Sequence, residues 1–188
     1  EANEHIETAM QLDPFSTINF HLKGYVLYVQ EKYDEALEWF EKSVQSGSEF
    51  KVSVVYYGQT LVLLERHLES LDYFKSFPND EPGDPKKLGG TTLALAALGE
   101  MDQAEIGIRK LESHLETGST ERAINLLILI RAVLGQKEKL FQLIEQGIQF
   151  RLPMMIYLGV EPILKPFRHE PKFRELVKQI LGDYSPIK

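Results

Sequence analysis

Residues 34–40 read DEALEWF, and within this stretch Ala36 stands four positions before Phe40. Residues four apart lie on one face of a helix, where the small residue lets a second helix approach and the large one fills the space beside it. The small member recurs every 34 residues, at Ala2, Ala36, Ser70 and Ala104. The large member follows it each time, as Ile6, Phe40, Phe74 and Ile108. This repetition predicts an all-α fold of stacked helical hairpins, which favours binding over catalysis.

The composition is that of a soluble globular protein, with 188 residues, 43% of them hydrophobic and 26% charged. There is no cysteine, which excludes disulfides and thiolate metal sites and favours the cytosol. No apolar run approaches the roughly 18 residues that span a bilayer, and the first residues lack the pattern of a signal peptide. We therefore expect a cytoplasmic location and no membrane partner.

The net charge of −7 is spread unevenly. Residues 1–150 hold 14 Lys and Arg against 24 Asp and Glu, whereas residues 151–188 hold 7 against 4. The acidic body repels phosphate backbones, so we expect no nucleic-acid binding by this segment.

Breaks in the helical pattern divide the chain into hairpins. Pro14 ends the first helix, and Gly99 and Gly135 mark later turns. The predicted helices are 1–12, 17–30, 33–45, 50–65, 67–77, 88–98, 101–114, 120–134 and 137–149. The step from Gly99 to Gly135 is 36 residues, and Leu140 takes the small position there. Such an atypical repeat near one end is typical of a capping unit.

Residues 151–188 depart from the repeat. Pro153, Pro162 and Pro166 predict short turns, and Pro171 begins a capping helix that runs to about residue 181, where Gly182 ends it. The predicted organisation is therefore the second helix of a truncated repeat at 1–14, about four hairpins at 15–149 and a proline-rich closing element with its capping helix at 151–188.

The spacing in residues 1–149 resembles the tetratricopeptide repeat. That repeat has a small residue in its first helix and A-x3-F in its second. Gly24 with Ala36-x3-Phe40 matches it, as does Gly58 followed 12 residues later by a serine in the small position. The resemblance implies a right-handed superhelical α-α solenoid that binds protein partners. It also implies that residues 1–12 lack an upstream partner helix, as expected for a piece of a longer protein.

Residues 160–173 resemble a closing element that follows the repeats of some bacterial signalling proteins, among them class III cyclases, kinases and winged-helix or AraC-type regulators. Pro162, Arg168, Pro171 and Phe173 match its pattern, while Glu161 and its counterpart at position 170 stand where aspartate is usual. The resemblance implies a module of a larger signalling or transcription-regulating protein.

In such a solenoid the first helix of each hairpin lines a concave groove. The side chains expected to face a ligand are aromatic, aliphatic or amide in character: His21, Tyr25, Tyr28, Val55, Gln59, Val62 and Leu93. This lining suits an apolar helix face or an extended peptide with apolar anchors, from another protein or from another domain of the same polypeptide. Two alternatives stay open: burial of these side chains between hairpins or under residues 151–188, and self-association as a homodimer.

The family's clamp for acidic C-terminal peptides is not matched. Its positions correspond to His21, Tyr25, Tyr56, Lys86 and Gly90, of which only Lys86 could compensate a carboxylate. A role as a chaperone clamp is therefore disfavoured.

Chemistry-bearing motifs are lacking in the sequence. The five histidines are scattered, with no H-E-x-x-H and no pair at metal-ligand spacing. Residues 83–92, GDPKKLGGTT, lack the G-K-[ST] ending of a phosphate loop. We expect no catalytic residue, no metal and no cofactor, and hence no enzyme activity in this segment.

Overall fold

A computed structural model describes residues 2–46, 52–77, 85–115 and 120–182. The secondary structure in these ranges is helical throughout, with no strand. The chain forms two compact units, the N-terminal unit of residues 1–73 and the C-terminal unit of residues 74–188. The predicted all-α fold of helical hairpins is confirmed, while its superhelical path and the division into 1–14, 15–149 and 151–188 stay predictions.

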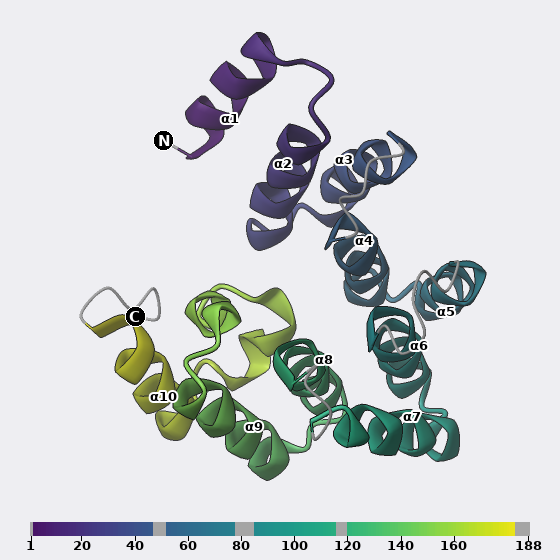
Figure 1. Cartoon of the computed structure of the whole chain (residues 1–188), viewed down its shortest axis with the longest axis vertical. Helices are drawn as coiled ribbons and strands as arrows, with labels where there is room; N and C mark the ends of the chain where they lie inside the picture. The colour runs from purple at the N-terminus through teal and green to yellow at the C-terminus, as the bar shows by residue number, and fades with distance from the viewer. Residues whose placement is uncertain (1, 47–51, 78–84, 116–119, 183–188) are drawn as a thin grey trace. The chain divides into compact units, whose positions relative to one another are not determined.

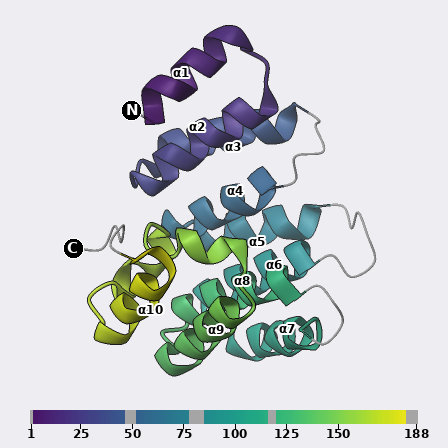
Figure 2. The same ribbon diagram turned by 60° about the vertical axis from the view of Figure 1, so that its left-hand side comes forward.

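The N-terminal unit contains α1 (Ala2–Leu12), α2 (Thr17–Val29), α3 (Tyr33–Gln45), α4 (Val52–Leu63) and most of α5 (His67–Ser76). Helices α2 and α3 form the tightest pair and run side by side in Figures 1 and 2, with α1 against α2 and α4 against α3. Leu27, Tyr28, Ala36 and Phe40 form its core.

The C-terminal unit contains α6 (Pro85–Leu98), α7 (Met101–Ser113), α8 (Thr120–Val133) and α9 (Lys137–Gln149), followed by the short 3-10 helices η1 (Pro153–Tyr157) and η2 (Pro162–Phe167) and by α10 (Pro171–Leu181). Helix α6 packs against α7 and α8, and α8 packs against α9 and η2. Helix α10 lies on α9 and η1, as Figure 1 shows for the yellow end of the chain.

The small-and-large pairs pack as the 34-residue step predicts. Both members are fully buried in the pairs that begin at Ala36, Ser70 and Ala104. A Cβ on Gly24 would lie 2.7 Å from the ring of Phe40, so only glycine lets α2 and α3 approach this closely. Ser70 donates a hydrogen bond to the Gly58 carbonyl at 2.9 Å, which explains how a hydroxyl fits a position held elsewhere by alanine.

A left-handed residue ends the first helix of each hairpin. Glu31, Glu65, Gly99 and Gly135 all have positive φ, between 59° and 78°. The amide of the next residue then donates to a carbonyl five residues back, for example from Glu100 to the Leu95 carbonyl at 3.0 Å. This is the hydrogen bond of the Schellman motif. The four left-handed residues stand 34, 34 and 36 residues apart, which is the period of the sequence repeat and its drift in the last hairpin.

We expect Gly99→Ala to destabilise the fold by about 1 kcal/mol, because a Cβ at φ 78° is strained although nothing lies within 4 Å of it. Urea unfolding followed by circular dichroism measures the change. Gly99→Asn is the control and should cost less, since asparagine tolerates this conformation. Equal stability of Gly99→Ala and the natural chain would contradict the backbone geometry.

Helix α6 begins at Pro85 instead of residue 88, because proline, which fixes φ and lacks an N–H, suits the first turn of a helix. Residues 78–84, which precede this helix, lie outside the described residues. In the closing element, the Glu161 carboxylate accepts a hydrogen bond from the Ile163 amide at 3.2 Å, so glutamate serves as the N-cap there.

Candidate interaction surface

A stripe of apolar side chains, exposed at one end and partly buried at the other, lies along α2. Ile18, Leu22, Tyr25 and Val29 follow one another at spacings of four, three and four residues, which places them on one side of the helix. Phe15, three residues before Ile18, continues the line into the turn between α1 and α2. We call these five residues the α2 stripe.

The α2 stripe is more exposed at its N-terminal end than at its C-terminal end. Phe15 is 86% exposed, Ile18 52% and Leu22 43%, while Tyr25 and Val29 are partly buried against the core of the N-terminal unit. The stripe therefore protrudes at its N-terminal end and is recessed at its C-terminal end. The largest apolar patch on a protein surface is often functional, which makes this end a candidate interaction surface.

Polar contacts between α1 and α2 fix the protruding end. The Asn19 side-chain amide donates to the carbonyls of Ala9 and Asp13, both at 3.2 Å. Lys23 forms an ion pair with Glu7 of α1. The turn that carries Phe15 and the 84% exposed Leu12 is therefore held in place by hydrogen bonds while its apolar side chains face solvent.

An aromatic cluster supports the recessed end. The ring of Tyr25 meets Tyr56 of α4 edge to face, with centroids 5.2 Å apart, and Tyr56 stacks on Phe40 at 5.8 Å. Tyr28 completes the cluster, 5.4 Å from Tyr56. Ring packing of this kind restricts the rotation of the Tyr25 side chain.

His21 lies beside this cluster and is buried. Its Nδ1 is 3.0 Å from the Ser53 hydroxyl, which lies 2.7 Å from the Ser43 hydroxyl. Ser43 in turn donates to the Thr17 carbonyl at 3.1 Å. Burial lowers the pKa of His21 to about 4, so the imidazole is neutral at pH 7. This arrangement satisfies three buried polar side chains between α2, α3 and α4.

The structure divides the seven expected groove residues into two groups. Tyr25 and Val55 are partly exposed, and their contact with a partner stays a prediction. The expectation of a solvent-facing position is wrong for the others, which are buried: His21, Tyr28, Gln59, Val62 and Leu93.

The spacing on α2 explains this error. At about 100° per residue, positions 21 and 28 lie about 60–80° away from position 18. His21 and Tyr28 consequently point towards α3 and α4, where they meet Phe40 and Tyr56. The exposed Leu22 and the partly buried Val29 lie on the outer side instead. The apolar spacing that begins at Phe15 was the signal in the sequence that could have located them.

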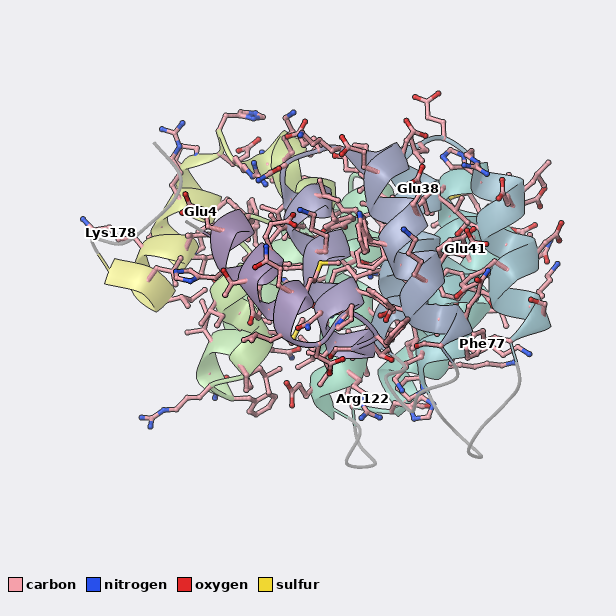
Figure 3. The ribbon with its side chains drawn as sticks, turned by 90° about the horizontal axis from the view of Figure 1, so that it is seen from above. Glu4, Glu38, Glu41, Phe77, Arg122 and Lys178 are labelled. Carbon is pink, nitrogen blue, oxygen red and sulfur yellow. The ribbon has the colours of Figure 1, made fainter. Side chains whose placement is uncertain are left out.

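Carboxylates of the N-terminal unit gather on other helices. Glu38 and Glu41 project from α3 (Figure 3), and Glu69 lies on α5. Burial raises the pKa of Tyr57, and the nearby charges of Glu41 and Glu69 raise it further. Helix α2 carries a single charged residue, Lys23, which Glu7 of α1 engages. The α2 stripe is therefore an uncharged surface in an acidic unit.

The described ranges hold no group of three or more His, Asp or Glu side chains placed to bind a metal ion. Nor do they contain a helix that is both long enough and apolar enough to cross a bilayer.

No protein-family model and no curated protein matches the chain. Among solved structures, the chain is similar to YrrB, described as a TPR (tetratricopeptide-repeat) protein with an unusual peptide-binding site. The TM-score is 0.45 and the identity 22%, over 80% of this chain and 76% of YrrB. The assignment to an all-α fold of helical hairpins rests on the helices described above, and the tetratricopeptide pattern of residues 1–149 stays a resemblance.

Proposed function

We propose that this chain is a protein-interaction module that binds an apolar helix face along the α2 stripe. The observation that carries the proposal is the run of apolar side chains from Phe15 to Val29, exposed at Phe15, Ile18 and Leu22 and partly buried at its end, at the three-and-four spacing with which one helix packs on another. Tyr25 and Leu22 would serve as the central anchors.

The closing element supports the proposal that the module belongs to a larger protein. Residues 160–173 match the pattern that follows the repeats of bacterial signalling and transcription-regulating proteins, at Pro162, Arg168, Pro171 and Phe173. On this resemblance we place the module in a larger, cytoplasmic regulator, where its partner is another protein or another domain of the same polypeptide.

We expect the natural chain to bind a synthetic helical peptide that carries leucines at three-and-four spacing on an otherwise neutral sequence. Fluorescence anisotropy of the labelled peptide against increasing protein measures the affinity, which we expect in the micromolar range for a single helix face. A peptide of the same composition in scrambled order should bind at least ten-fold more weakly.

Substitution of Leu22 tests the location of this binding. Leu22→Glu places a charge inside the contact and should weaken peptide binding at least ten-fold. Leu68→Glu is the matched control, since Leu68 is 67% exposed on α5 outside the stripe, and it should leave binding unchanged. Equal binding of the ordered and the scrambled peptide, or equal losses in the two variants, would refute the proposal.

A further inference from the structure

We infer that the helix bound by the α2 stripe is α2 of a second copy of this chain, so that the chain forms an antiparallel, two-fold symmetric dimer. This inference rests on the proposed function, because it uses the same surface, and it names the partner.

The first argument is the symmetry of the spacing. Ile18 and Tyr25 lie four and three residues on either side of Leu22, and Phe15 and Val29 lie seven residues on either side. When two such helices pack antiparallel about an axis at Leu22, Phe15 faces Val29 of the other copy. Ile18 then lies within one residue, about 1.5 Å along the helix axis, of Tyr25 of the other copy, and Leu22 faces its own counterpart. Every member of the stripe has an apolar partner in this register, as an isologous interface requires.

The second argument is the slope of exposure. Phe15 and Ile18 protrude at one end, while Tyr25 and Val29 are recessed at the other. An antiparallel copy sets the protruding end of each stripe against the recessed end of the other, so the surface complements itself. In a parallel pair, Phe15 would meet Phe15 and the recessed ends would be left apart.

The third argument is the absence of charge on the stripe. The charged residue of α2, Lys23, is engaged by Glu7, and the carboxylates at Glu38 and Glu41 project from α3. The five side chains of the stripe carry no charge that could pair with a charged peptide, whereas the uncharged stripe of a second copy needs no such pairing.

The area fits a weak but specific dimer. At the exposures found for Leu12, Phe15, Ile18 and Leu22, with smaller contributions from Tyr25 and Val29, each copy offers on the order of 500 Å² of apolar surface. A symmetric pair then buries about 1,000 Å², the lower limit for specific interfaces. We therefore expect a dissociation constant in the micromolar range.

Sedimentation equilibrium of the natural chain measures this association. We expect a monomer–dimer equilibrium that strengthens as salt is raised, because salt screens the repulsion between two copies of net charge −7. A chain that stays monomeric up to several hundred micromolar would overturn the inference. If that chain still binds the ordered peptide, the proposed function stands and only the choice of partner is wrong.

Charge substitution at the axis tests the register. Leu22→Glu and Leu22→Lys should each be monomeric, since like charges would meet at the two-fold axis, and a 1:1 mixture of the two should associate again. Leu68→Glu and Leu68→Lys are the controls and should dimerise like the natural chain. Unchanged dimerisation of the Leu22 variants would assign the interface to another face.

Cross-linking gives a second readout that does not depend on charge. Because the chain has no cysteine, single substitutions place one thiol at a chosen site. With a short bismaleimide, Leu22→Cys should link to itself, and Phe15→Cys should link to Val29→Cys in a mixture. Self-linking of Phe15→Cys at the rate of Leu22→Cys would show a parallel pair and overturn the antiparallel register. Leu68→Cys measures the background of random collisions.

Discussion

Phe40→Ala is expected to lower the free energy of unfolding by about 3–5 kcal/mol. Phe40 is fully buried, and its ring lies against the rings of His21, Tyr28 and Tyr56. Truncation removes the transfer free energy of the ring and leaves a cavity, because the neighbouring aromatic rings are held by one another and cannot collapse into the space. Chemical denaturation followed by circular dichroism measures the loss.

Phe15→Ala is the matched control, since it makes the same chemical change at a side chain that is 86% exposed. It should alter stability by no more than about 0.5 kcal/mol when measured at protein concentrations too low for association. Phe74→Ala, at the equivalent buried position one repeat later, should behave like Phe40→Ala. A cost below roughly 1 kcal/mol at Phe40 would contradict the repeat register.

The stability of the fold is expected to fall by about 3 kcal/mol as the pH is lowered from 6.5 to 4, through His21 alone. Burial holds the pKa of His21 at about 4 in the folded chain, against 6.5 for an unperturbed imidazole. Between these values the unfolded chain binds a proton that the folded chain does not, so the free energy of unfolding rises with pH across this window. A difference of one pKa unit corresponds to about 1.4 kcal/mol.

Urea unfolding at a series of pH values measures this slope, and His21→Gln isolates it, because the variant cannot take up that proton. The variant should lose some stability at pH 7, where the hydrogen bond of His21 to the Ser53 hydroxyl is weakened, and should show a shallower fall towards pH 4. Carboxylates titrate equally in both chains, so the difference between the two curves belongs to His21. Parallel curves would show that the imidazole can take up a proton in the folded state.

Much of the fold followed from short-range patterns. Pro14, Gly99 and Gly135 end helices through backbone geometry alone, so the breaks they mark were predictable from the residues themselves. The pairing of Ala36 with Phe40 was equally predictable, because residues four apart share a helix face in any helix. The left-handed conformation of Glu31 and Glu65 was not predictable from the sequence, since glutamate carries no preference for that conformation.

The candidate site was predicted less well, because a helix in a layered fold has several buried sides. The sequence marked Tyr25 and Tyr28 as one apolar face, but their neighbours in space decide which of them is exposed. Tyr28 is enclosed by Phe40 and Tyr56, residues 12 and 28 positions further along the chain, whereas Tyr25 keeps part of its surface in solvent.

By itself, the sequence determined that this protein is built from helical hairpins at a period of 34 residues, with a close-packed glycine or small residue opposite a large one. These features arise from backbone conformation and from spacing within one or two helices. Only the tertiary structure decided which apolar residues remain outside the core. Phe15, Ile18 and Leu22 lie on the side of α2 that neither α1 nor α3 covers, and that exposure arises from the packing directions of three helices together.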